Sequence, residues 1–254
     1  MSKIKFMNIP FYTDQPPIKM SEKVNQWWGA FREGFFYEPE LIDFFFRKLK
    51  AMRKTDDQPL FFLDVGTNTG SFCFMTLFDK NIECAAFEPN KEVYEILCEN
   101  IDLNDLNKQL KSYNFGLWNE DTTKELKIPV NTKDSGLSTL GSNPTRFAYD
   151  NQTGEYTTMK IECKKLDTCM NENYFTKKVD AIKIDSEGAE LFILKGAKEL
   201  LQRDKPMILL EYFDLNTQQF GYNREEIKSF LVDIGYNTFH EPTAGDLVAE
   251  WSEP

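Results

Sequence analysis

The sequence predicts an α/β domain with a doubly wound, mostly parallel sheet of seven strands, of the Rossmann-like type. Short apolar runs alternate with helical stretches along most of the chain. The runs at 60–63, 180–184 and 207–210 are nearly continuous rather than alternating, which is typical of parallel strands with helices on both faces. Two short final runs joined by Glu-Pro-Thr-Ala-Gly have hairpin length, so the sheet is expected to close with an antiparallel strand.

The N-terminal part is expected to form an arm and a helical cap. Prolines without apolar periodicity indicate an extended arm over residues 1–22. A helical pattern follows through Val24, Trp27, Trp28 and Phe31, and a second helix is expected to begin at Pro39, because proline is favourable at the first helical position. The polar stretch 53–59 marks the boundary, so the predicted domains are 1–58 and 59–254.

The remaining elements follow in regular order. Strands are expected at 60–65, 84–87, 112–115, 179–184, 207–210, 236–239 and 247–251, and helices at 71–78, 91–100, 189–201 and 224–232. Between the two halves lies a segment rich in Ser, Thr, Asn and Gly, Asn131–Asn151. A loop of this length inside a domain is usually functional or mobile, so it is expected to contribute to the acceptor side of a site.

Composition excludes several classes of protein. Hydrophobic residues make up 41% of the 254 residues, which is enough for a core and excludes a disordered chain. The net charge of −11 disfavours a nucleic-acid partner, and no segment is apolar enough for a signal peptide or membrane insertion, so a cytoplasmic protein is expected. Five cysteines without a C-x-x-C pair and a single histidine disfavour zinc clusters and most histidine-assisted nucleophiles.

The first predicted strand runs into the turn Asp64-Val-Gly66-Thr67-Asn68-Thr-Gly70. Glycines between a strand and a helix let a ligand approach the backbone. Their spacing differs from G-x-G-x-x-G, and no phosphate-binding G-x-x-x-x-G-K-[ST] occurs, so a dinucleotide cofactor and a nucleoside triphosphate are disfavoured. The second strand ends in Phe87-Glu88-Pro89, where a carboxylate is well placed to accept both hydroxyl hydrogens of a ribose.

These motifs, together with the block Ile182-Lys183-Ile184-Asp185-Ser186-Glu187-Gly188-Ala189-Glu190 and Leu194–Ala197 behind it, resemble the FkbM family of S-adenosylmethionine-dependent methyltransferases. The resemblance covers about residues 60–240, and upstream Phe36-Tyr-Glu-Pro-Glu40 looks like the Trp-Glu-Pro element of some members, with Tyr in place of Trp. It implies a class I methyltransferase fold, S-adenosylmethionine as cofactor, and O-methylation of a sugar, a glycan or another small hydroxylated acceptor.

Cofactor contacts are expected from the strand ends and from the long loop. Asn114 and Phe115 follow the third strand, where this fold usually meets the adenine, and Ser138 belongs to a segment that resembles the family's Gly-x-Ser element near the methionine end. The full set of expected cofactor residues is Asp64, Gly66, Thr67, Asn68, Gly70, Phe87, Glu88, Pro89, Asn114, Phe115, Ser138 and Asp185.

The catalytic candidates are carboxylates at the carboxyl ends of parallel strands, where ligands bind in open α/β sheets. Asp185 or Glu187 is the preferred base for the acceptor hydroxyl, followed by Glu211 and His240. Alternatively, Asp185 and Glu211 could hold Mg²⁺, which prefers oxygen ligands and would acidify the hydroxyl. An ion pair between Asp185 and Lys183 is compatible with either role, because the two share a strand face.

The sequence is also compatible with other functions. A methyltransferase of another small hydroxylated metabolite and a non-catalytic S-adenosylmethionine-binding module both fit the motifs. A nucleic-acid methyltransferase is disfavoured by the charge, and a dehydrogenase by the glycine spacing. The sequence is compatible with a homodimer, and it does not identify the acceptor.

Overall fold

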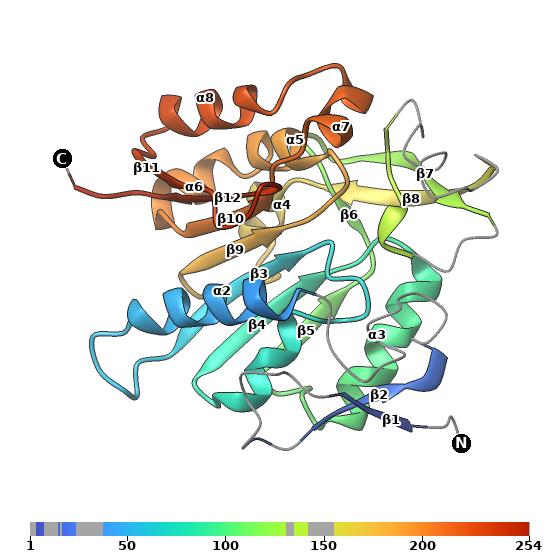
Figure 1. Cartoon of the computed structure of the whole chain (residues 1–254), viewed down its shortest axis with the longest axis vertical. Helices are drawn as coiled ribbons and strands as arrows, with labels where there is room; N and C mark the ends of the chain where they lie inside the picture. Colours follow the sequence, from blue (N-terminus) through green and yellow to red (C-terminus); the bar gives the residue numbers. More distant parts are fainter. Residues whose placement is uncertain are drawn as a thin grey trace.

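The computed structural model describes residues 4–7, 15, 17–23, 38–130, 135–141 and 155–253. A seven-stranded sheet with the order β11-β12-β10-β9-β3-β4-β5 forms its centre (Figure 1). In that order the strands are Thr238–His240, Asp246–Glu250, Met207–Glu211, Ala181–Ile184, Leu60–Val65, Ile82–Phe87 and Leu110–Tyr113. The strands from β10 to β5 are parallel, and β12 is antiparallel to both of its neighbours. The predicted fold class is therefore confirmed.

The register of the sheet brings the ends of separate strands to one edge. Val65, the last residue of β3, is opposite Phe87 in β4 and Ile184 in β9. The residues that follow these three strands therefore emerge side by side, although they lie far apart in the sequence. This edge carries the candidate site.

Helices cover both faces of the sheet and enclose two apolar clusters. One cluster lies under α2 (Pro39–Ala51), a 3-10 helix (Cys73–Phe78) and α3 (Lys91–Leu103). The other lies under α4 to α6 and α8, whose bounds are Leu166–Asn171, Glu190–Lys195, Lys198–Asp204 and Glu225–Asp233. Figure 1 shows α6 and α8 at the opposite end of the molecule from α3. Alternate residues of β3 serve the two clusters: Phe61 and Leu63 face one, and Phe62 the other.

Two predicted helices differ from the structure. The stretch expected as one helix over 189–201 is divided into α5 and α6 at Gly196. A Cβ at Gly196 would lie 2.0 Å from the carbonyl oxygen of Trp118, so the chain needs glycine where another segment passes. The helix expected over 71–78 is a 3-10 helix, Cys73–Phe78, that follows the glycine turn directly.

The N-terminal arm contains a two-stranded antiparallel ribbon, β1 (Ile4–Met7) and β2 (Ile18–Ser21). The sequence predicted an extended arm here but not the pairing. Met7, Ile18 and Met20 are fully buried in the same cluster as α2. The helix α2 begins at Pro39, as expected, whereas the pattern through Val24, Trp27, Trp28 and Phe31 and the residue Tyr37 lie outside the described residues. The domain division after residue 58 stays a prediction.

A small three-stranded sheet, order β6-β8-β7, was not expected from the sequence. Its strands are Gly116–Leu117, Tyr156–Lys164 and Thr122–Pro129, and it lies beyond the end of β5 (Figure 1). The partly alternating polar and apolar residues of β8 were a signal that could have identified this strand. The remaining elements are α7 (Asp214–Thr217) and 3-10 helices at Ser135–Leu137 and Gln218–Phe220.

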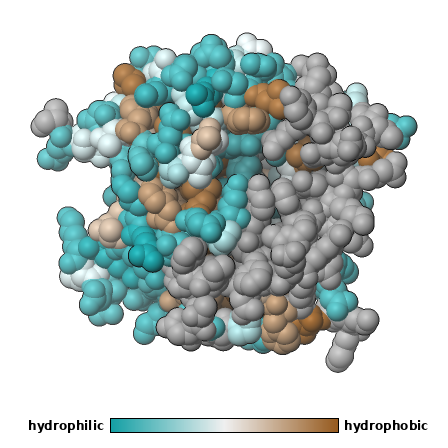
Figure 2. Space-filling view, in the orientation of Figure 1, coloured by the Kyte–Doolittle hydropathy of each residue, from teal (hydrophilic) through white to brown (hydrophobic). Residues whose placement is uncertain are grey.

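The face shown in Figure 2 is mostly hydrophilic, with small hydrophobic patches. Within the described residues, no helix has the length and apolar character needed to cross a membrane. All five cysteines have free thiols.

Candidate active site

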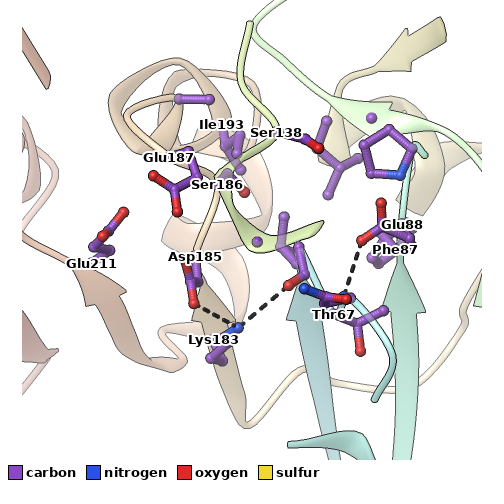
Figure 3. A pocket seen from close by; sticks show the side chains of 18 of the residues that line it. Thr67, Phe87, Glu88, Ser138, Lys183, Asp185, Ser186, Glu187, Ile193 and Glu211 are labelled. Carbon is purple, nitrogen blue, oxygen red and sulfur yellow. Dashed lines mark hydrogen bonds and ion pairs between the residues drawn. The ribbon is translucent and has the colours of Figure 1, made fainter. Parts of the chain in front are cut away.

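A pocket of about 500 Å³ lies at the carboxyl ends of β3, β4, β9 and β10 (Figure 3). Two further segments contribute to its wall. One is the part of the predicted long loop that the structure describes, residues 135–141, called the strap below. The other is the turn between β11 and β12, Thr243–Asp246, called the hairpin turn below.

The turn after β3 forms the floor of the pocket. Gly66 has φ of +71°, and a Cβ there would lie 1.8 Å from the carbonyl oxygen of Asp185, so only glycine allows β3 and β9 to end this close together. Gly66, Thr67 and Asn68, which the sequence proposed as cofactor contacts, line the pocket. Gly70 is not among the lining residues.

Asp64 does not line the pocket either, because it is fully buried behind the turn. One of its oxygens, Oδ2, accepts hydrogen bonds from the Thr67 hydroxyl at 2.6 Å and the Cys73 N–H at 3.2 Å. Burial raises the pKa of Asp64, although Lys183 and Thr67 lower it. The structure therefore gives Asp64 the role of holding the turn in shape rather than of touching a ligand.

Glu88, at the end of β4, lines the pocket and is 8% exposed. Its two carboxylate oxygens accept the backbone N–H groups of Asn90 at 2.8 Å and Asn68 at 3.0 Å. Burial raises the pKa of Glu88 to about 7, against the effect of these two hydrogen bonds. A carboxylate so fixed can accept hydrogen bonds from a diol.

Some residues around Glu88 line the pocket, and another holds the end of β4 in place. Phe87, Pro89 and Phe115, which the sequence also proposed as cofactor contacts, line the pocket. The side chain of Asn114 instead donates to the carbonyl oxygens of Glu88 at 2.8 Å and Pro89 at 3.2 Å, and Asn114 is not a lining residue. It therefore fixes the strand end.

The same end of the pocket has an apolar wall that the sequence did not reveal. The small sheet contributes Leu117 from β6, Leu126 from β7 and Ile161 from β8, and Ile193 comes from α5. These side chains are buried and suit a flat, apolar ligand group. They were missed because nothing local in the sequence places the small sheet beside β4.

Lys183 lies between two carboxylates at the centre of the pocket. Its Nζ is 3.4 Å from Asp185 Oδ2 and 3.7 Å from Asp64 Oδ1. Burial disfavours its charged form, but Asp185 and Asp64 outweigh that effect and raise its pKa, so Lys183 stays protonated. The expected ion pair between Lys183 and Asp185 is confirmed.

Three of the four predicted catalytic residues meet in one cluster. Oxygens of Asp185, Glu187 and Glu211 lie within 4.8 Å of one another and line the pocket. The amide Nδ2 of Asn216, a residue that the sequence did not single out, donates to Glu187 Oε2 at 3.1 Å and Glu211 Oε2 at 2.7 Å. Figure 3 shows the cluster on the opposite side of Lys183 from Glu88.

His240, the fourth candidate, is exposed at the end of β11. Its ring centroid is 5.9 Å from that of Phe44 in α2, and it is not among the pocket residues. The structure therefore does not bring His240 to the carboxylate cluster.

The turn that carries Glu187 is fixed from several sides. Glu187 and Gly188 have φ of +53° and +100°, and Glu190 Oε1 accepts the N–H groups of Ser186 and Gly188 at 2.9 and 3.3 Å. Burial raises the pKa of Glu190 to about 7. Tyr222 donates its hydroxyl to the Gly188 carbonyl at 2.8 Å. The turn that carries Glu187 is thus held in one conformation.

The strap reaches from the small sheet to this turn. Thr139 exchanges two backbone hydrogen bonds with Lys127 of β7, at 2.9 and 3.0 Å, and its hydroxyl donates to the Glu187 carbonyl at 3.0 Å. Gly136, Ser138 and Leu140 line the pocket. Ser138, which the sequence proposed as a cofactor contact, therefore lies at the pocket, and its contact with a cofactor stays a prediction.

The sequence implies two groups that the pocket could bind, S-adenosylmethionine and Mg²⁺. A diol-binding carboxylate, a floor that admits no Cβ and an apolar wall fit S-adenosylmethionine. The three clustered carboxylates offer the oxygen ligands that Mg²⁺ prefers, although the Asn216 amide already donates to two of them.

Comparisons with known proteins agree with this geometry. A family model described as "Methyltransferase FkbM domain" matches residues 64–238. Methyltransferase sdnD from Sordaria araneosa is 27% identical over 212 residues, covering 76% of this chain and 77% of that protein.

A solved structure shows the same fold. An O-methyltransferase from Bacillus cereus in complex with S-adenosylhomocysteine has a TM-score of 0.50 at 13% identity, with 85% of this chain and 82% of that chain covered. A methyltransferase FkbM from Methylobacillus flagellatus has a TM-score of 0.49 at 16% identity, and the match covers 78% of this chain but 45% of that longer one.

Proposed function

The chain belongs to the FkbM methyltransferase family, and from this premise we propose that it transfers a methyl group from S-adenosylmethionine to a hydroxyl of a sugar or another small hydroxylated metabolite. One observation carries the proposal. A cluster of three carboxylates faces the same pocket as Glu88, on the far side of Lys183 (Figure 3). This arrangement separates a diol-binding position from a position where a hydroxyl can lose its proton.

Different residues of the pocket would contact different parts of the cofactor. Glu88 would accept hydrogen bonds from the ribose hydroxyls, and the apolar wall of Leu117, Leu126 and Ile161 would contact the adenine. The strap, with Ser138, would cover the methionine end. When bound, S-adenosylmethionine supplies an electrophilic methyl group on a positively charged sulfur.

The carboxylate cluster then serves the acceptor. Asp185 or Glu187 would accept the proton of the acceptor hydroxyl as the oxygen of that hydroxyl takes up the methyl group that the cofactor supplies. Alignment of the acceptor oxygen with the methyl carbon and the sulfur would be the larger part of the catalysis, because in-line displacement depends on geometry. Asn216 and Glu190 support this role by fixing Glu187 and the turn around it.

Carboxylate variants test the chemical step. Asp185→Asn or Glu187→Gln is expected to lower turnover by roughly a hundredfold. For Glu187→Gln, the dissociation constant of S-adenosylhomocysteine should change little. Glu241→Gln is the matched control, because Glu241 is an exposed carboxylate that does not line the pocket. If both variants keep full turnover, the base is another group, with Glu211 as the next candidate. Cofactor binding without turnover on any hydroxylated acceptor would favour a non-catalytic binding module.

Chelation separates direct proton transfer from metal assistance. If Asp185 and Glu187 act directly, activity survives dialysis against EDTA. If Asp185 and Glu211 hold Mg²⁺, EDTA abolishes turnover and added Mg²⁺ restores it. The measurement is turnover before dialysis, after dialysis and after metal is added back.

A further inference from the structure

An exposed aromatic ring lines the pocket at the end remote from Glu88. Phe213 is 42% exposed, and it follows Glu211 by two residues. Five large hydrophobic side chains are exposed among the described residues: Ile4, Phe6, Tyr156, Phe213 and Val232. Of these five, Phe213 is the one that lines the pocket. Apolar surface left open to water inside a pocket indicates a contact that a ligand completes.

The backbone around Phe213 is firmly held. Its carbonyl oxygen accepts the N–H groups of Asn216 at 3.0 Å and Thr217 at 3.2 Å, in the first turn of α7. The preceding residue, Tyr212, donates its N–H to the carbonyl of Gly245 in the hairpin turn at 2.6 Å. The backbone of Phe213 and the hairpin turn are therefore held in place before a ligand binds. Phe213 and the hairpin turn together are called the rim below.

The hairpin turn is itself closed by side-chain hydrogen bonds. Thr243 donates its hydroxyl to Asp246 and accepts the Gly245 N–H at 3.1 Å. Thr243 and Asp246 line the pocket together with Phe213 and Glu211. This end thus offers one aromatic face among oxygen atoms, unlike the apolar wall of Leu117, Leu126 and Ile161 at the other end.

We propose that Phe213 is the acceptor platform: it contacts the apolar C–H face of a pyranose ring, while the oxygens of Glu211, Thr243 and Asp246 hydrogen-bond the ring's hydroxyls. A pyranose has such a face and many hydroxyl donors, and carboxylate oxygens accept several hydrogen bonds each. The rim places oxygen atoms beside its single aromatic ring, and a pyranose, with hydroxyls around an apolar face, uses both kinds of contact.

This inference rests on the proposed function, since it names the substrate class of the same site. It assigns specificity for the acceptor to Phe213 and leaves the cofactor to the Glu88 end. Changes at Phe213 should therefore act on the acceptor alone. This separation gives the experiment two independent readouts.

The test is saturation-transfer NMR on the full chain with saturating S-adenosylhomocysteine. The probes are the methyl glycosides of glucose, galactose, mannose and rhamnose, with catechol as the flat aromatic comparison. We expect at least one glycoside to bind the wild type. Phe213→Leu, which keeps an apolar side chain but removes the ring, should weaken that binding at least tenfold, and Phe213→Tyr should retain it.

Val232→Ala is the control, because Val232 is 52% exposed on α8 and does not line the pocket. Equal glycoside binding by Phe213→Leu and the wild type overturns the proposal. Binding of catechol with no glycoside, or of no glycoside at all, also overturns it. Calorimetry with S-adenosylhomocysteine checks the folding of each variant. Failure of the wild type to bind that molecule is the outcome that contradicts the proposed function instead.

Discussion

At the scale of single residues, Lys183 has the most constrained position in the site. Its ammonium group lies between Asp64, which is fully buried, and Asp185. Lys183→Met leaves the Asp64 carboxylate buried without its cation, so we expect the free energy of unfolding to fall by about 3–5 kcal/mol. Urea denaturation measures this loss.

A double variant provides the control for Lys183. Adding Asp64→Asn to Lys183→Met removes the buried charge as well as its partner, so a large part of the lost stability should return. If the single and double variants are equally unstable, packing of the Lys183 side chain, and not its charge, explains the loss.

Glu88 makes cofactor affinity depend on pH. Burial raises its pKa to about 7, and the ionised carboxylate is the form that can accept hydrogen bonds from both ribose hydroxyls. Affinity for S-adenosylhomocysteine should therefore fall as the pH is lowered through about 7. In the free protein the same raised pKa makes Glu88 reduce stability as the pH rises from the ordinary carboxyl range to about 7.

Calorimetric titrations between pH 6 and 8 measure the effect of Glu88. Glu88→Gln should bind at least tenfold more weakly at pH 8, about 1.4 kcal/mol, and should lose the pH dependence. The prediction is wrong if the variant keeps the wild-type slope. Glu190, whose pKa is also about 7, would then be the group to examine.

At the scale of elements, the turn after β3 depends on glycine for space as well as for conformation. Gly66→Ala adds a Cβ 1.8 Å from the Asp185 carbonyl oxygen, in addition to the strain of φ +71°. We expect it to cost well over about 3 kcal/mol of stability. Gly221→Ala is the matched control, because its φ is +78° but no atom lies within 4 Å of the added Cβ.

Thermal and urea denaturation of these two variants separate the two contributions. Gly221→Ala should cost about 1 kcal/mol, which is the backbone strain alone. Equal losses in both variants would show that β3 and β9 move apart readily, and the close approach would not be a requirement of the fold.

At the scale of the whole molecule, the N-terminal ribbon shares its core with the sheet. Ile18 is fully buried in the cluster under α2, whereas Ile4 in the paired strand is 43% exposed. Ile18→Ala should reduce the free energy of unfolding by about 2–5 kcal/mol, with one unfolding transition for the whole chain, and Ile4→Ala by less than about 0.5 kcal/mol. A separate early transition that only Ile18→Ala shifts would instead support residues 1–58 as an independent unit.

The sequence by itself determined the central sheet and the residues at its edge. β3 was predicted to the residue, and the turn after it, Glu88 and the Asp185–Glu187 segment were identified as ligand-facing. These features are readable because continuous apolar runs, glycines and strand-end carboxylates are local properties. Since parallel strands end at one edge, the pattern also predicted that these residues would meet.

Only the tertiary structure decided which of these residues reach the pocket and what completes it. Asp64 and Asn114 proved to be supports, and His240 lies against Phe44 instead of the carboxylates. Nothing local in the sequence places Asn216, the apolar wall of the small sheet or the rim at Phe213 beside the pocket. Their roles come from contacts between segments far apart in the sequence, and those contacts exist only once the apolar faces of the helices and strands have packed together.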